Sequence, residues 1–168
     1  TFLQGLKRVL DKAPKFRSRI TAHFVGLDPK KYQSEAKALG LEENLDFVPK
    51  VPYLESLGWM KKATALFSID VVKNSLLSKL PDYVGSGKPI MAVSDKGSPT
   101  WRYVEKLHGL TAEQSNVEDI AEKLETLAKA WENDPELKAY RYTEEESSFF
   151  ASENTTAILS EALLGICR

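Results

Sequence analysis

Two short apolar runs constrain the fold of this sequence more than any other feature. Residues 65–69, apart from Ser68, and residues 89–93 are apolar, and both runs lack the regular polar alternation of a half-exposed strand. Such runs are typical of parallel strands that are buried on both faces. Because parallel neighbours need a crossover connection, usually a helix, the runs predict an α/β domain.

Helical patterns and further strand patterns alternate with these runs. The expected strands are 20–25, 45–48, 65–69 and 89–93, and the expected helices are 1–12, 30–39, 53–63, 78–86, 98–107, a long one capped by Asn116, and 153–166. Ser98 followed by Pro99 is the usual order of an N-cap and a first helical residue. The alternation predicts a Rossmann-like parallel sheet flanked by helices, in one domain that spans 1–168 and ends in a helical tail over 135–168.

Composition excludes several classes of protein. The 168 residues carry 23 basic and 24 acidic side chains, so the basic excess of a nucleic-acid-binding domain is missing. No apolar stretch approaches the roughly 20 residues that span a bilayer. The lone Cys167 makes no intrachain disulfide, which fits a cytoplasmic protein. Helical spacing starts at Thr1 itself, so we expect a fragment of a longer protein. We expect the full-length protein to lie in the cytoplasm, either free or at the inner face of the membrane.

The residues that usually carry metal or cofactor chemistry are sparse. His23, His108 and Cys167 do not form the spacing of a metal site. Glycine-rich loops of the dinucleotide-binding and P-loop kinds are missing from the sequence. We therefore expect no metal and no cofactor, and no residue is identified as a catalytic base.

The segment that follows the run 65–69 holds the strongest candidate site. If Ser78 is a helix N-cap, the free amides of Lys79 and Leu80 and the lysine charge form an anion site, with Asp82 one turn behind. The small residues 85–87 let this helix pack closely on the next strand. The alternative is a well-capped helix start with no ligand.

Residues 79–90 read Lys-Leu-Pro-Asp-Tyr-Val-Gly-Ser-Gly-Lys-Pro-Ile. This resembles the donor-site signature of the retaining GT-B glycosyltransferases of family four, which is Lys-Leu-x-Glu-Tyr-x-small-x-Gly-Lys-Pro-(Ile/Val). Other landmarks follow in the family's order: 24–26, 45–52, 53–70, and 109–110 with 117–127 as the closing strand and helix. The resemblance implies the C-terminal, donor-binding domain of a hexosyltransferase that acts in a pathway such as polysaccharide biosynthesis.

The resemblance also implies a set of nucleotide-sugar-binding residues. They are Lys50, Val51, Asn74, Ser75, Ser78, Lys79 and Asp82. Asp82 takes the position that binds the ribose hydroxyls, Ser78 and Lys79 lie near the diphosphate, Asn74 lies at the donor sugar, and Lys50 and Val51 lie against the base. The family often has glutamate where this chain has Asn74 and Asp82; asparagine carries no negative charge, and aspartate reaches one methylene less than glutamate.

The family places a first strand, a glycine turn and a basic pair ahead of the first helix, and none is present in this sequence. The resemblance therefore implies that the same polypeptide has an N-terminal acceptor domain. It also implies that this fragment is inactive alone and binds the donor weakly. The alternatives are a domain binding another nucleotide, as in oxidoreductases and flavodoxins, and a non-catalytic Rossmann-like domain used for nucleotide binding or assembly.

Overall fold

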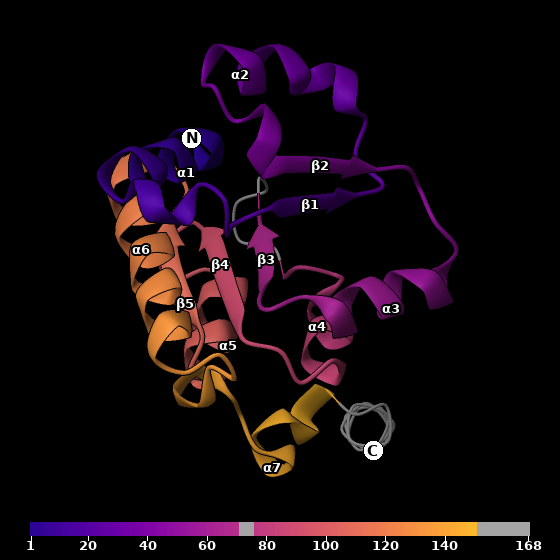
Figure 1. Ribbon diagram of the computed structural model, residues 1–168. Helices are drawn as coiled ribbons and strands as arrows, with labels where there is room; N and C mark the ends of the chain where they lie inside the picture. Colours follow the sequence, from indigo (N-terminus) through magenta and orange to yellow (C-terminus); the bar gives the residue numbers. More distant parts are fainter. Residues whose placement is uncertain (71–75, 151–168) are drawn as a thin grey trace, which may run out of the picture.

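Parallel strands form the framework of the molecule, but they form two sheets and not one (Figure 1). The computed structural model describes residues 1–70 and 76–150. The smaller sheet pairs β1 (Ala22–Val25) with β2 (Leu45–Val48). The larger sheet has the order β3 (Leu66–Ile69), β4 (Ile90–Ser94) and β5 (Leu110–Glu113). The predicted α/β class is confirmed, and the single predicted sheet is divided between β1 and β3.

Helices connect successive strands, as parallel pairing requires. The connecting helices are α2 (Gln33–Ala38), α3 (Tyr53–Lys62), α4 (Leu80–Gly85) and α5 (Pro99–Lys106). The helix α1 (Phe2–Lys12) precedes β1, and α6 (Val117–Asn133) and α7 (Glu144–Ser147) follow β5. The helix predicted over 30–39 is shorter, because a 3₁₀ turn over Pro29–Lys31 precedes α2. The helix predicted over 153–166 lies outside the described residues.

The two longest helices of the described part, α1 and α6, pack side by side on one face of the larger sheet (Figure 1). Their contact buries Leu6, Val9 and Leu10 of α1 and Ile120 of α6. A β-carbon on Gly5 would stand only 2.6 Å from Cγ2 of Ile120, so glycine is what allows the helices to approach this closely. Ion pairs line the exposed margin, including Lys12–Glu125 at 2.6 Å and Lys15–Glu132 at 2.7 Å.

The central strand β4 is buried along its whole length, as its unbroken apolar run predicts. One face of the larger sheet is covered by α4 and α5, whose Leu80, Val84 and Val104 pack with Ile90. Ser98 caps α5 by accepting a hydrogen bond from the Trp101 amide at 3.2 Å, which confirms the predicted cap.

Two predictions about α4 are wrong. The helix begins at Leu80 and its N-cap position is Lys79, so Ser78 does not cap it. A β-carbon on Gly85 or Gly87 would meet no atom within 4 Å, so close packing is not their role. Gly87 instead has a φ of +68°, a left-handed conformation in which glycine avoids the strain that a side chain brings.

The described part of the tail folds back onto its own domain. The Tyr142 hydroxyl donates to the Val84 carbonyl at 2.9 Å, which satisfies an acceptor in the last turn of α4. His108 and Glu146 interact at 2.8 Å, and the ring of Phe150 packs edge-on against Tyr103. No helix of the described residues has the length and apolarity that crossing a bilayer requires.

Candidate functional site

The predicted site residues that the structure describes lie in loops and helix starts that follow the strands. Lys79 and Asp82 form an ion pair in which Lys79 Nζ stands 3.3 Å from Asp82 Oδ2. Tyr53, at the start of α3, donates its hydroxyl to Asp82 Oδ1 at 2.8 Å. The Lys79 ammonium also lies 5.4 Å from the centre of the Tyr53 ring, a cation–π distance.

Tyr53 is a member of this cluster that sequence reasoning missed. The apolar spacing of residues 53–63 predicts the helix, but it says nothing about which residue at the helix start turns toward α4. The only sequence signal is an aromatic residue at the first helical position, directly after Pro52. The contact with Asp82 depends on how α3 and α4 are placed, which residue spacing does not encode.

The start of α4 differs from the anion site that the sequence predicts. The Leu80 amide donates to the Leu77 carbonyl at 3.0 Å, so it is not free to bind a ligand. Pro81 has no amide hydrogen. The start of α4 therefore offers the charge of the Lys79 side chain and not the pair of unpaired amides that the sequence predicts.

Buried polar contacts hold the segment that leads to Lys79. The Thr100 hydroxyl donates to Asp70 Oδ2 at 3.2 Å and accepts a hydrogen bond from the Leu77 amide at 3.0 Å. Asp70 directly follows β3 and Thr100 lies in the first turn of α5, and both are buried. These contacts fix the position of the chain just before α4, and so the position of Lys79.

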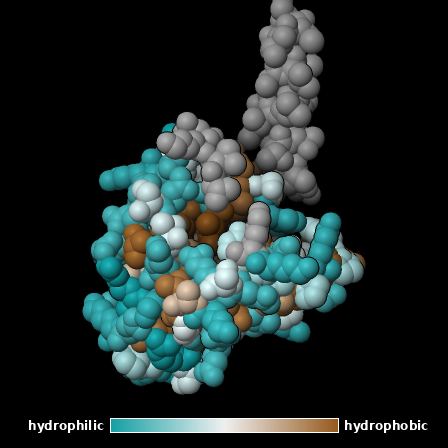
Figure 2. Space-filling view, turned by 90° about the horizontal axis from the view of Figure 1, so that it is seen from above, coloured by the Kyte–Doolittle hydropathy of each residue, from teal (hydrophilic) through white to brown (hydrophobic). Residues whose placement is uncertain are grey.

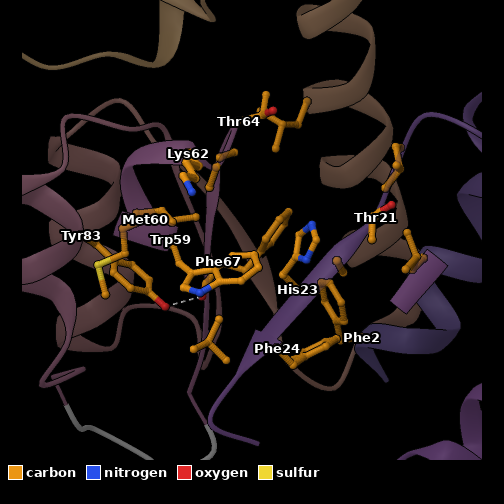
Figure 3. Close-up of a pocket in the computed structure, with 18 of the residues that line it drawn as sticks. Phe2, Thr21, His23, Phe24, Trp59, Met60, Lys62, Thr64, Phe67 and Tyr83 are labelled. Atoms are coloured by element: carbon orange, nitrogen blue, oxygen red, sulfur yellow. Dashed lines mark hydrogen bonds between the residues drawn. The ribbon is translucent and has the colours of Figure 1, made fainter. Parts of the chain in front are cut away.

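Lys50, Val51, Tyr53 and Lys79 line one cavity of about 960 Å³. Figure 3 shows other residues of its lining, among them Phe2, Trp59 and Phe67. We call it the inter-sheet cavity, because its walls come from β1 and β3, with α1, α3 and α6 around them. Gly26 turns the chain at the end of β1 with a φ of +84°. The structure thus brings the predicted base-side residues Lys50 and Val51 to the same cavity as Lys79.

Hydrogen bonding and burial shift the pKa of two tyrosines beside Asp82. The hydrogen bond to Asp82 raises the pKa of the Tyr53 hydroxyl, because it favours the protonated donor. Burial, helped by the Asp82 charge, raises the pKa of Tyr83. Both hydroxyls therefore stay protonated at neutral pH and act as hydrogen-bond donors.

Among the described residues, the others considered from the sequence lie outside the cluster of Lys79, Asp82 and Tyr53. Asn74 and Ser75 lie outside the described residues, and Ser78 is exposed on the surface. His23 interacts with Asp46 at 2.9 Å across the β1–β2 pair. Within 1–70 and 76–150, no three His, Cys, Asp or Glu side chains are grouped as metal ligands would be.

No protein-family model and no curated protein sequence matches the chain, but solved structures do. HepE from Anabaena, in complex with UDP and glucose, matches with a TM-score of 0.72 at 18% identity, over 96% of this chain and 44% of that one. The C-terminal domain of LpcC, a group 1 family glycosyl transferase from Francisella tularensis, matches with a TM-score of 0.62 at 19% identity, over 88% and 74%. The UDP-forming α,α-trehalose-phosphate synthase from Burkholderia vietnamiensis matches with a TM-score of 0.65 at 13% identity, over 98% and 40%.

These matches show the fold. The chain has the fold of a C-terminal domain of GT-B glycosyltransferases, as the resemblance predicts. It spans less than half the length of HepE and of the trehalose-phosphate synthase.

Proposed function

We propose that this chain is the donor-binding domain of a retaining glycosyltransferase and holds a nucleoside-diphosphate sugar for a hexosyl transfer. The observation that carries the proposal is the cluster of Lys79, Asp82 and Tyr53 in a domain of GT-B fold. A lysine beside a carboxylate supplies both kinds of contact that a nucleotide diphosphate needs. Ammonium groups attract phosphate, and carboxylates accept hydrogen bonds from ribose hydroxyls.

Asp82 has the capacity to bind a ribose while it keeps its present partners. An ionised carboxylate has about four acceptor positions. Tyr53 and Lys79 use one on each oxygen, so the acceptor positions that remain suit the two adjacent hydroxyls of a ribose. In this arrangement Tyr53 and Lys79 hold the carboxylate in place, and Lys79 also faces the diphosphate.

Lys50 and Val51 are proposed to lie beside the base, because they line the same cavity as Lys79 and follow β2. UDP is the first nucleotide to test, since HepE was solved with UDP and the trehalose-phosphate synthase is UDP-forming. The acceptor is proposed to bind to a second domain of the same polypeptide. We propose that donor binding needs no metal ion and that this chain alone does not catalyse transfer.

A titration of the 168-residue chain with UDP, GDP and NAD tests donor binding. A nucleoside diphosphate at tenfold its dissociation constant is expected to raise the free energy of unfolding by about 1.4 kcal/mol, and NAD is expected to have no comparable effect. Lys79→Ala is expected to weaken UDP binding about tenfold, the loss of one charge-assisted contact. Lys61→Ala, on the exposed side of α3, is the matched control. Equal effects of the two variants, or protection by NAD alone, would contradict the proposal.

The internal partners of Asp82 also favour a second candidate, a non-catalytic domain used for assembly. Both carboxylate oxygens already have protein partners, so Asp82 has a structural role that needs no nucleotide. A donor-hydrolysis assay on a polypeptide that contains both domains separates the two. Release of the nucleoside diphosphate supports the transferase, and its absence together with no binding of UDP or GDP supports assembly.

A further inference from the structure

Tyr53 lies on the surface of the molecule, where its ring has no core to fill. It is the first residue of α3, a helix that buries none of its residues, and 56% of Tyr53 itself is exposed. Exposed apolar side chains are ordinary on protein surfaces. Figure 2 shows them in small groups among hydrophilic side chains on the face seen from above. Packing therefore does not account for Tyr53, and its role depends on what its hydroxyl contacts.

The Tyr53 hydroxyl and the Lys79 ammonium bind different oxygens of the Asp82 carboxylate. Tyr53 donates to Oδ1 at 2.8 Å, and Lys79 donates to Oδ2 at 3.3 Å. A carboxylate with a single donor is free to turn about its last side-chain bond, whereas donors on both oxygens fix the plane of the group. The Asp82 side chain is 21% exposed, against 52% for Lys79, so it is the more enclosed member of the ion pair. The cluster thus presents one carboxylate in a fixed orientation.

Of the two donors, Tyr53 is the one that fixes Asp82 to another part of the molecule. Lys79 lies at the start of the same helix as Asp82, three residues before it. Their separation of 3.3 Å exceeds the roughly 2.7–2.9 Å of a charge-assisted hydrogen bond. Tyr53 comes from α3 and stands closer to the carboxylate. Loss of the Tyr53 hydroxyl would leave Asp82 with the longer and purely local contact.

The first turn of α3 holds Tyr53 in place. Pro52 precedes it with a φ of −57°, which the proline ring fixes. The Ser56 amide donates to the Pro52 carbonyl at 3.0 Å, and the Ser56 hydroxyl donates to the Tyr53 carbonyl at 2.6 Å. The Lys79 ammonium lies 5.4 Å from the centre of the Tyr53 ring. Both the backbone and the ring are held, so the hydroxyl stays beside Asp82 before any ligand binds.

A carboxylate held in this way distinguishes a ribose from a 2′-deoxyribose. Ribose has two adjacent hydroxyls, and the acceptor positions that remain on Asp82 allow one hydrogen bond to each oxygen. A 2′-deoxyribose lacks one of these hydroxyls, so it makes one hydrogen bond fewer. A hydrogen bond to a charged group changes affinity about tenfold. If the carboxylate turned freely, the entropy lost in ordering it would oppose ribose binding and remove part of this advantage.

We propose that Tyr53 is a positioning residue that makes the donor site select ribonucleotides over 2′-deoxyribonucleotides, because it holds Oδ1 of Asp82. This inference rests on the proposed donor-binding function and extends it to the class of nucleotide. Sugars carried by UDP or GDP are accepted, and sugars carried by 2′-deoxythymidine diphosphate bind weakly. The selection acts on the ribose and not on the base, so it applies equally to UDP and GDP.

The test compares UDP with 2′-deoxy-UDP, which differ by one hydroxyl, on the 168-residue chain. Dissociation constants are measured by NMR titration for the parent chain, Tyr53→Phe and the control Tyr32→Phe. Tyr32 lies at the start of α2, where its ring stacks on Phe47. The parent chain is expected to bind UDP about tenfold more tightly than 2′-deoxy-UDP. Tyr53→Phe is expected to reduce this preference to about threefold or less, because UDP binding weakens more than 2′-deoxy-UDP binding.

A second variant tests whether Tyr53 acts through Asp82. Asp82→Asn keeps the size of the side chain and removes its charge, so it is expected to remove most of the preference for UDP. Tyr53→Phe added to Asp82→Asn is expected to change the UDP dissociation constant by less than about twofold, because residues that act through one contact are not additive. Urea midpoints are measured for every variant to confirm that each one is folded.

The two nucleotides together decide the outcome. A preference for UDP that falls in Tyr53→Phe and is unchanged in Tyr32→Phe supports the proposal. Equal loss of affinity for both nucleotides in Tyr53→Phe overturns it, because Tyr53 then supports only the local structure. Tighter UDP binding in Tyr53→Phe also overturns it, because the hydroxyl then competes with the ribose.

Failure of this inference is distinguishable from failure of the proposed function. A parent chain that binds UDP and 2′-deoxy-UDP equally overturns the inference and leaves the proposed nucleotide site intact. A parent chain that binds neither nucleotide, and no GDP, overturns both.

Discussion

The two halves of the molecule are built from the same kinds of element but are buried very differently. In the half made of β3, β4 and β5 with α4, α5 and α6, every residue of β4 is buried. In the half made of β1 and β2 with α2 and α3, the residues of β1 alternate between partly buried and exposed, and α3 buries none. The alternating pattern of strands and helices therefore predicts the type of each element. How deeply a strand is buried depends on the strands beside it, and β4 has one on each side.

A pair of glycine substitutions tests this contrast with the largest expected effect. A β-carbon on Gly109 would overlap the Ile90 carbonyl oxygen and stand 2.5 Å from Val104 Cγ1, whereas one on Gly58 would meet nothing within 4 Å. Gly109→Ala is expected to lower the free energy of unfolding by about 3 kcal/mol through overpacking. Gly58→Ala is expected to raise it by up to about 1 kcal/mol, because alanine favours the helix.

Urea denaturation of the two variants beside the parent chain measures both changes. Comparable losses in the two variants would show that α3 is packed as tightly as β4 and β5, and the contrast between the halves would fail.

Matched valines provide a second test. Val93 of β4 is 1% exposed and Val25 of β1 is 36% exposed. Val93→Ala is expected to cost about 2 kcal/mol, from two lost methyl groups and the cavity they leave. Val25→Ala is expected to cost less than about 0.5 kcal/mol in the chain alone. Thermal and urea unfolding of both variants give the values, and a cost at Val25 close to that at Val93 would contradict the contrast in burial between β1 and β4.

The sequence predicts the burial of β4 well and the arrangement of β1 beside β3 poorly. The run 89–93 needs burial on both faces, and β4 has it, so pattern and structure agree. The patterns of residues 20–25 and 45–48 predict strands correctly, but a pattern of apolar residues does not state which strand lies beside which. The division between β1 and β3 therefore appears only in the structure.

The candidate site shows the same limit. The resemblance to a donor-site signature predicts that Lys79 and Asp82 belong to one binding site, and the structure brings their side chains into contact. The predicted Ser78 cap is wrong because the turn from Leu77 to Leu80 takes the amide that the cap would leave free. Tyr53 joins the cluster from another helix, a long-range contact with no local signal.

A third prediction concerns Tyr142, which lies in the tail and contacts the last turn of α4. Burial raises the pKa of Tyr142 to about 12, and its hydroxyl donates to Val84. Tyr142→Phe is expected to cost about 1 kcal/mol at pH 7, the value of one hydrogen bond. The folded pKa lies above the unfolded value of about 10, so the contribution of Tyr142 is complete below pH 10 and is lost as the pH rises toward 12.

Between pH 10 and pH 12 the free energy of unfolding of the parent chain is expected to fall by about 1 kcal/mol more than that of Tyr142→Phe. This value is reduced because the Tyr142 side chain is partly exposed. Urea midpoints at pH 7, 10 and 11.5 measure it, with Tyr140→Phe in the same tail as the control. A pH dependence unchanged by Tyr142→Phe would mean that the tail does not bury this hydroxyl.

The smallest expected effect lies at the margin between α1 and α6. Glu132 accepts hydrogen bonds from Lys15 at 2.7 Å and Arg19 at 2.8 Å, and these contacts hold the pKa of its carboxyl below the ordinary value, Lys15 contributing most. A lowered folded pKa means that the contribution is present above the unfolded pKa and is lost as the pH falls through the folded one. Glu132→Gln is therefore expected to lower the urea midpoint slightly at pH 7 and to converge with the parent chain as the pH falls through the folded pKa of Glu132. Glu145→Gln on α7 is the control, and it should show no such convergence.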